Sequence, residues 1–146
     1  CEVAAYCKKE GKTLWDMMLE MYEKYGYFKE TQYTITLKGV DGARQIAEIM
    51  DKLRKNPPKA FGDLKVLRFR DYEEDKIVDM ETGSVTGTGL PKSNVLYFEL
   101  PDNFWCCARP SGTEPKIKFY MGVKGSSLAD AADKLTKLTE DLKAVL

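Results

Sequence analysis

NVLYFELPDNFWCCARPSGTEPKIKFYMGV, residues 94–123, is the stretch that decides the fold. It contains successive runs rich in aromatic and aliphatic residues: NVLYFEL, FWCCA and IKFYMGV. The turn signal Pro101-Asp102-Asn103 separates the first two runs, so we expect them to pair as a hairpin. A polar segment, RPSGTEP, separates the second run from the third. The stretch therefore predicts consecutive strands with a tight loop between the last two.

The segment before this stretch alternates between strand and helix patterns. QYTITLKG (32–39) alternates and is rich in β-branched residues, which predicts a strand. We expect Asp41 to cap the helix that follows, because apolar residues recur after it at spacings of three and four until Asn56-Pro57-Pro58 ends the pattern. LKVLRFRDY (64–72) predicts a second strand.

Two further segments lie between that strand and the quoted stretch. RDYEEDKIVDMETG (70–83) is dense in charge, and we interpret it as a surface loop. GSVTGTG (83–89) is rich in glycine but lacks the Gly-Lys-Ser/Thr of a phosphate-binding P-loop and the third glycine of a dinucleotide fingerprint. We therefore interpret it as a loop or hairpin tip.

A last helix follows the quoted stretch. Ser127 and Asp130 form its capping pattern, and its apolar residues, from Leu128 to Val145, lie on one face. From residue 31 the order of elements is strand, helix, strand, strand, strand, loop, strand, helix. Amphipathic helices in this order predict an α+β fold in which a largely antiparallel sheet is covered by helices on one face.

Two short helices are predicted before residue 31. Residues 2–10 are helical in pattern and end at Gly11, and Thr13 with Asp16 forms a capping box before a second helix that ends at Gly26. A stripe of methionines and aromatic residues on that helix is typical of core packing or of a domain contact. We expect a linker at 26–30. The chain begins inside a helical pattern without an initiator methionine, so we expect it to be part of a longer protein.

Composition excludes several classes of function. The chain has 23 basic and 23 acidic residues, which disfavours a nucleic-acid surface. No apolar run is long enough for a membrane span and no secretory signal opens the chain, so we expect no membrane association and a cytoplasmic location. There is no histidine, so histidine-based triads and zinc sites are excluded within the chain. We interpret the four cysteines as buried, reduced thiols.

The loop RPSGTEP has the composition of an anion site. Arg109 offers a planar fork of donors, Ser111 and Thr113 offer hydroxyl groups, and Gly112 permits close approach of backbone amides or a positive φ. Lys118 shares a strand face with Lys116 and is placed to point toward the same pocket. A phosphate is the ligand that fits these donors. The alternative is a tight turn in which the arginine pairs with a carboxylate.

RPSGTEPKIKFY (109–120) resembles the phosphate-binding loop of the α-D-phosphohexomutases, the phosphoglucomutases and phosphomannomutases. TGTGLPKSNVLYFEL and the opening up to YEKYGYFKE are also similar to that family, so the resemblance spans most of the chain. It implies that residues 31–146 are the TATA-binding-protein-like C-terminal domain. It implies equally that residues 1–30 are the helical tail of the preceding sugar-binding domain.

The resemblance also implies the role of the loop. In that family the loop grips the phosphate of a bound hexose phosphate while a phosphoryl group moves between positions 1 and 6. The residues that inherit this role are Arg109, Ser111, Gly112, Thr113 and, less directly, Lys118.

The remaining parts of the family's active site have no counterpart in this sequence. The phosphoryl-carrying serine, the aspartate-rich magnesium loop and the sugar-reading GEES loop all belong upstream in the family. We therefore expect a phosphohexomutase (an isomerase) only in the full-length protein, with magnesium as its metal. We expect an inactive fragment here, with no cofactor and no catalytic or metal-binding residue. Its partners would be a hexose phosphate and the N-terminal domains of the same chain.

Rival functions remain open at the level of sequence. One is a stand-alone module that binds phosphorylated groups without catalysis. The other is nucleic-acid binding, which the fold analogy alone suggests and the balanced charge disfavours. The preferred hexose is not fixed by these residues; glucose is favoured over mannose only slightly.

Overall fold

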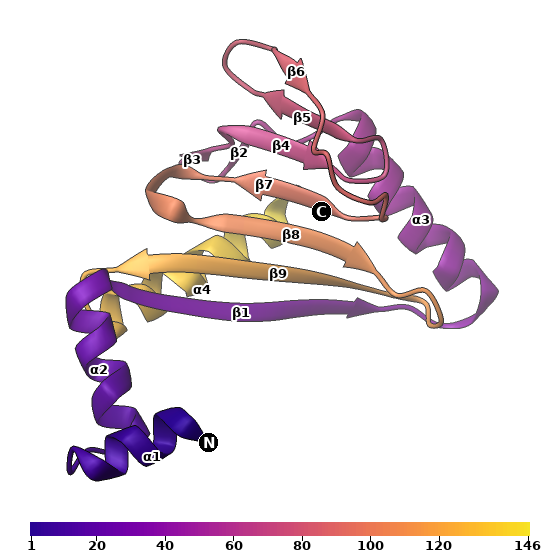
Figure 1. The fold of residues 1–146 in the computed structure, drawn as a ribbon. Coiled ribbons are helices and arrows are strands. Elements are labelled where there is room, and N and C mark those ends of the chain that lie inside the picture. The colour runs from indigo at the N-terminus through magenta and orange to yellow at the C-terminus, as the bar shows by residue number, and fades with distance from the viewer.

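The computed structural model describes residues 1–146 apart from the side chain of Val40. Two helices precede a sheet layer. One long helix interrupts the succession of its strands along the chain, and another follows the last strand (Figure 1). The elements in chain order are α1 (Glu2–Lys9), α2 (Leu14–Tyr25), β1 (Tyr27–Thr36), α3 (Gly39–Lys55), β2 (Ala60–Phe61), β3 (Leu64–Lys65), β4 (Arg68–Asp71), β5 (Lys76–Asp79), β6 (Val85–Thr86), β7 (Leu96–Glu99), the 3-10 turn η1 (Pro101–Asn103), β8 (Trp105–Pro110), β9 (Lys116–Gly125) and α4 (Leu128–Val145).

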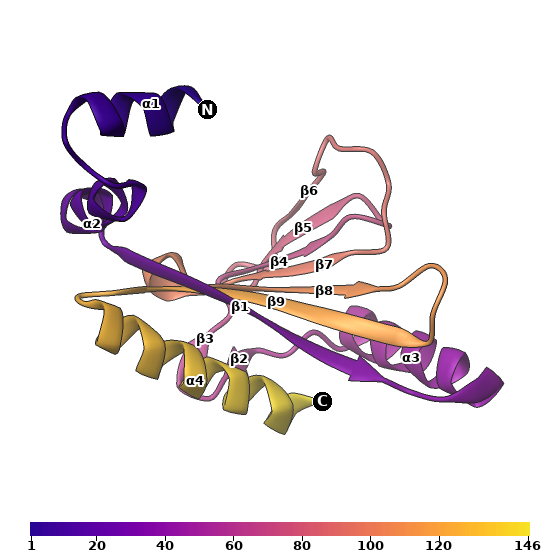
Figure 2. The ribbon, with the colours of Figure 1, turned by 90° about the horizontal axis from the view of Figure 1, so that it is seen from below.

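The main sheet has seven strands in the order β1-β9-β8-β7-β4-β5-β6, and every pairing in it is antiparallel. Helices α3 and α4 lie against one face, and the small β2–β3 hairpin lies on the same side (Figure 2). The other face carries no helix of this layer. The α+β class, the largely antiparallel sheet and the helices on one face are confirmed.

Strand β9 shows how alternation builds the core. Its Ile117, Phe119 and Met121 are fully buried beneath the helices, while Lys118 and Tyr120 point to the other face. The core continues into neighbouring elements through further buried apolar side chains. They include Ile46, Met50, Leu53, Phe61, Phe69, Leu96, Phe98, Cys106, Ala108, Leu135, Leu138 and Leu142.

Helix α4 begins where its capping pattern predicts. The Ser127 hydroxyl accepts a hydrogen bond from the amide of Asp130 at 3.1 Å, and the Asp130 carboxylate accepts one from the amide of Ser126 at 2.7 Å. A Cβ on Gly125 would lie 2.5 Å from the backbone of Ala131, so a glycine is required where β9 turns into α4. Leu128, expected on the apolar face, is exposed.

Several expected boundaries are wrong. The predicted linker at 26–30 is strand, because β1 begins at Tyr27 and pairs with β9 from Gly125 onward. Asp41 does not cap α3: the helix begins at Gly39, with Lys38 as its N-cap, and Asp41 lies in its first turn.

The charged segment 70–83 is also not a loop. It contains the end of β4 and all of β5, which pair as a hairpin. The carboxylate of Asp71 accepts hydrogen bonds from the amides of Glu73 and Glu74, so the acidic run forms the turn of this hairpin. The predicted strand 64–72 is split, because β3 pairs with β2 outside the main sheet.

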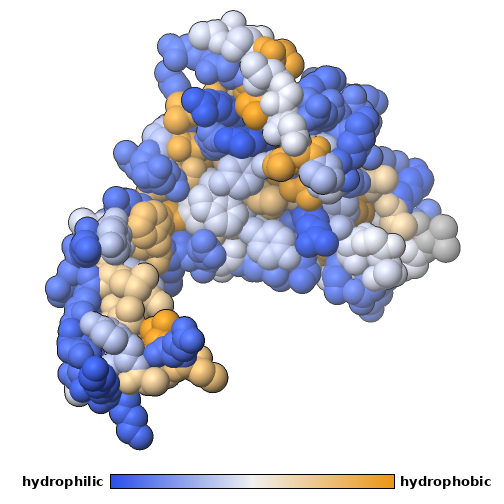
Figure 3. All heavy atoms as spheres, in the orientation of Figure 1, coloured by the Kyte–Doolittle hydropathy of each residue, from blue (hydrophilic) through white to orange (hydrophobic). Residues whose placement is uncertain are grey.

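Helices α1 and α2 form an N-terminal arm, residues 2–25, that extends away from the sheet (Figure 1). The capping box at Thr13 and Asp16 and the end of α2 at Gly26 are confirmed. Cys7 is the arm's buried residue, and its Sγ lies 3.4 Å from the Sδ of Met17. Figure 3 shows hydrophobic residues gathered along the arm. The exposed ones on it are Val3, Tyr6, Leu14, Trp15, Met18, Met21 and Tyr25.

No helix among the described residues is long and apolar enough to cross a membrane.

Candidate functional site

The loop 111–115 joins the ends of two paired strands. Arg109 and Pro110, expected within the loop, are the last residues of β8, and Arg109 lies opposite Lys118 of β9. The amide of Ser111 donates a hydrogen bond to the carbonyl of Lys116 at 2.8 Å, which closes the loop at its base. Both ends of the loop are therefore held by the ladder between the strands, so ordering its backbone around a ligand costs little further entropy.

Inside the loop, the Ser111 hydroxyl acts as a local acceptor. Its Oγ accepts hydrogen bonds from the amides of Thr113 at 3.4 Å and Glu114 at 3.3 Å. This arrangement leaves the hydroxyl hydrogen of Ser111 available to donate to a ligand. Gly112 is exposed, has no positive φ, and has no atom within 4 Å of where a Cβ would stand. A glycine at this position therefore leaves open space beside the backbone, and it is not needed for unusual dihedral angles.

A hollow of about 310 Å³ lies beside this loop on the helix-free face of the sheet. Its lining residues are Arg109, Pro110, Ser111, Gly112, Glu114, Lys116, Lys118 and Tyr120. Four of the five residues singled out from the sequence are thus brought together. Thr113 is not among the lining residues.

The charges around the hollow are mostly positive. Arg109 is exposed, and no carboxylate of the described residues lies within ion-pairing distance of it or of Lys118. The alternative of a turn held by an arginine–carboxylate pair therefore does not describe this loop. Arg109 and Lys118 face the hollow from neighbouring strands, each without an ion pair among the described residues.

Glu114 is one of the lining residues that the sequence analysis did not single out, as are Pro110, Lys116 and Tyr120. Its carboxylate forms an ion pair with the ammonium group of Lys116. The hydrogen bond from Lys116 lowers the pKa of Glu114 below its ordinary value, and Lys118 adds a smaller electrostatic attraction. The signal was present in the sequence, because Glu114 and Lys116 flank the proline that ends the loop.

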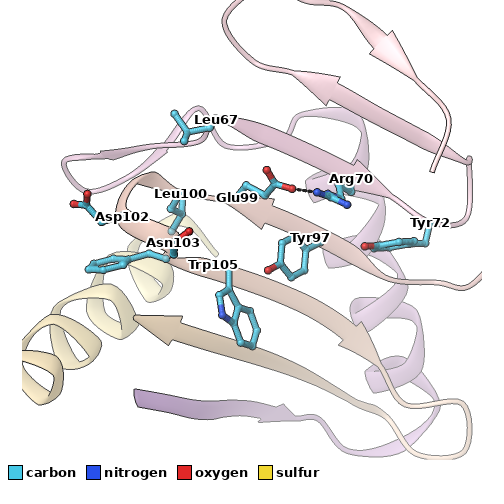
Figure 4. Close-up of a pocket in the computed structure, with 10 residues that line it drawn as sticks. Leu67, Arg70, Tyr72, Tyr97, Glu99, Leu100, Asp102, Asn103 and Trp105 are labelled. Carbon is cyan, nitrogen blue, oxygen red and sulfur yellow. Dashed lines mark hydrogen bonds and ion pairs between the residues drawn. The ribbon is translucent and has the colours of Figure 1, made fainter. Parts of the chain in front are cut away.

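A larger hollow, of about 730 Å³, opens farther along the same face (Figure 4). Tyr97 and Trp105 stack in it with ring centroids 5.7 Å apart and planes 12° apart, and Arg70 forms an ion pair with Glu99 above them. A Cβ on residue 122 would lie 2.3 Å from the Trp105 indole, so Gly122 makes room for that ring.

Burial governs the protonation of Tyr97 in this larger hollow. Burial, with help from Glu99, raises the pKa of Tyr97 to about 12, so its hydroxyl remains protonated. The two cysteines of β8 are similar: burial raises the pKa of Cys106 strongly, and that of Cys107 is also raised, with Arg109 opposing the effect. Neither thiol is prepared to act as a nucleophile, because the thiolate is the reactive form.

Among the described residues, no group of three or more histidine, cysteine, aspartate or glutamate side chains is placed to hold a metal ion. The cationic side chains and the amides around the loop hollow suit the binding of a small anion.

Comparison with known proteins agrees with the sequence resemblance. The chain matches no protein-family model. It is 36% identical over 135 residues to a phosphoglucomutase of Staphylococcus aureus strain bovine RF122 / ET3-1, and equally to that of strain USA300. These alignments cover 92% of this chain and 24% of each relative, so the chain spans about a quarter of the length of the curated relatives it matches.

Among solved structures, the chain is similar to pp63/parafusin from Paramecium, a phosphoglucomutase crystallised in an open form. The sequence identity is 17% and the TM-score is 0.48, over 90% of this chain and 23% of that one.

Proposed function

We propose that the chain is the C-terminal domain of a phosphoglucomutase of the phosphohexomutase family, and that it holds the non-reacting phosphate of a hexose phosphate. The similarity to curated phosphoglucomutases supports this proposal. The observation that carries the proposal is the cluster of Arg109, Lys116 and Lys118 around one hollow beside a closed loop. Glucose is the hexose in this proposal, because the relatives are named phosphoglucomutases.

The proposed contacts follow from the donors of the hollow. Arg109 binds two phosphate oxygens through its planar guanidinium, and Lys118 adds charge from the neighbouring strand. The hydroxyl of Ser111 and the amide of Gly112 supply neutral donors, whereas the amide of Thr113 already donates to Ser111 Oγ. Holding the remote phosphate fixes the position of the reacting end of the sugar, where binding energy lowers the barrier to phosphoryl transfer.

The reaction itself requires residues outside this chain. In this proposal the full-length protein is an isomerase that moves a phosphoryl group between positions 1 and 6 of the hexose. The serine that carries the group, the magnesium site and the sugar-reading loop belong to the domains that precede residue 31. The apolar face of the arm, including Met18 and Met21, then packs against those domains.

Ligand binding tests the proposal directly. Hydrogen bonds to charged groups contribute roughly 1.5–3 kcal/mol each, but the costs of association remove much of that sum. We expect glucose 6-phosphate to bind the 146-residue chain with a dissociation constant near the millimolar level, about 4 kcal/mol. An amide chemical-shift titration should show changes at residues 109–118, and glucose alone should produce none.

Variants of the two arginines sharpen that titration. Arg109→Ala should abolish binding, and Arg109→Lys should restore it only in part, because an ammonium group cannot make the two-pronged contact. Arg44 on α3 is exposed and pairs with Asp41 and Glu48, so Arg44→Ala is the matched control and should bind like the unmodified chain. Equal shifts with glucose and glucose 6-phosphate, or shifts away from the loop, would show that the loop is only a turn.

Catalysis should be absent from the isolated chain. We expect the purified chain to be a folded monomer that does not convert glucose 1-phosphate, because the nucleophile and the metal site lie elsewhere in the family sequence. A coupled assay for glucose 6-phosphate, at enzyme concentrations high enough to reveal slow turnover, checks this. Turnover that persists after contaminating mutase is excluded would contradict the assignment.

A further inference from the structure

We infer that the carboxylate of Glu114 is an internal competitor for the phosphate: it holds Lys116 in the empty loop and is displaced from Lys116 when the ligand binds. The inference rests on the proposed function, because it concerns the same hollow. Besides the residues that contact the phosphate, it names a residue that sets the affinity of the site.

Geometry places the two groups in competition. Glu114 and Lys116 both line the hollow of Arg109 and Lys118, and the Glu114 carboxylate is the anion that the Lys116 ammonium group contacts. The amide of Lys116 also donates a hydrogen bond to the carbonyl of Glu114 at 2.7 Å, so one tight turn fixes the pair. A phosphate held by Arg109 therefore lies near Lys116, whose ammonium group is already paired with Glu114.

The balance of charge favours exchange. The hollow carries three cationic side chains and one carboxylate. With Glu114 paired, the cations exceed the carboxylate by two charges, and release of Glu114 makes the third cation available to a phosphate dianion. Phosphate oxygens, like carboxylate oxygens, accept charge-assisted hydrogen bonds from ammonium groups.

The exposure of the two side chains shows which partner moves. The side chain of Glu114 is 59% exposed, whereas that of Lys116 is 26% exposed. Glu114 can thus rotate into water, while Lys116 remains at the wall of the hollow. Ion pairs this exposed are weak, so the competition should change the affinity for phosphate by roughly two- to fivefold rather than abolish binding.

The test is a titration of the 146-residue chain with inorganic phosphate at low ionic strength, followed through the amide shifts of residues 109–118. Glu114→Gln should lower the dissociation constant by roughly two- to fivefold. Glu114→Ala should give a similar gain. Glu81→Gln removes an exposed carboxylate at the β5–β6 turn and should leave the constant unchanged.

A second variant separates this mechanism from simple repulsion between Glu114 and phosphate. Lys116→Ala should weaken binding, and adding Glu114→Gln to it should bring no further gain, because there is no longer a lysine to release. If Glu114→Gln still raises the affinity for phosphate in the absence of Lys116, the inference is overturned. It is also overturned if Glu114→Gln alone binds phosphate with the same affinity as the unmodified chain.

The proposed function fails in a different way. If phosphate shifts the loop in neither the unmodified chain nor Glu114→Gln, the loop is not a phosphate site and both proposals are overturned. If the unmodified chain binds phosphate and Arg109→Ala does not, but Glu114→Gln binds no more tightly, only the role of Glu114 is wrong.

Discussion

The sheet layer and the N-terminal arm use similar side chains with opposite results. Met50 of α3 and Met121 of β9 are 2% and 0% exposed, whereas Met18 and Met21 of α2 are 39% and 44% exposed. Helices α3 and α2 are both amphipathic, and they differ in the elements that they pack against. Helix α3 packs against a sheet, while α2 packs mainly against α1 and β1. An apolar stripe thus indicates that a helix requires a partner, not that the partner lies in the same chain segment.

The contrast extends to how each helix is anchored. Helix α4 buries Ala131, Leu135, Leu138 and Leu142 against the sheet, and α2 buries no residue. Tyr22 stacks on Tyr27 with centroids 5.6 Å apart, so the arm touches the layer chiefly near its junction. The arm should therefore depend on the layer for its position but contribute little to its stability.

The largest effect that tests this contrast is on the free energy of unfolding. Phe119→Ala should destabilise the chain by about 3–5 kcal/mol, because a fully buried ring leaves a cavity in the middle of β9. Trp15→Ala removes a larger ring from the arm, where it is 57% exposed, and should change stability by less than about 0.5 kcal/mol. Urea denaturation measures both. Similar losses from the two variants would show that arm and layer share one core.

The next effect concerns local opening. Amide hydrogens of α2 should exchange with solvent on the order of 100-fold faster than those of α4, a difference of about 2.7 kcal/mol in opening free energy. The reason is that α4 opens only when the sheet layer loosens, whereas α2 has no buried residue to retain it. Hydrogen exchange followed by mass spectrometry or NMR gives the rates. Uniform protection of both helices would contradict the division into arm and layer.

The smallest effect compares two helix caps of the same kind. Ser127 of α4 and Thr13 of α2 each accept a hydrogen bond from the third amide of their helix, both at 3.1 Å. Ser127→Ala should lower the stability of the whole chain by about 1 kcal/mol. Thr13→Ala should leave global stability unchanged and only increase exchange within α2. Thermal unfolding distinguishes the two, and an equal fall in midpoint would make the arm part of the cooperative unit.

Much of the layer could be predicted because its signals are local. The run IKFYMGV (117–123) and the turn at 101–103 predicted strands, and the Ser127 pattern predicted the start of α4. The failures occurred where a partner outweighs local preference. Residues 27–30 read as a linker but pair with β9, and the acidic run after Arg70 forms a hairpin because β4 offers it a free edge.

The candidate site likewise has features that local sequence predicts and features that depend on tertiary contacts. The sequence alone determined that Arg109, Ser111, Gly112, Thr113 and Lys118 are donors in or beside a short turn, since residue type and alternation are local properties. Only the tertiary structure decided that the register of β8 and β9 sets Arg109 opposite Lys118, and that Glu114 folds onto Lys116. Register and side-chain pairing depend on how two strands align in space, and that alignment is set by the buried face of the sheet together with the geometry of the loop that joins the strands.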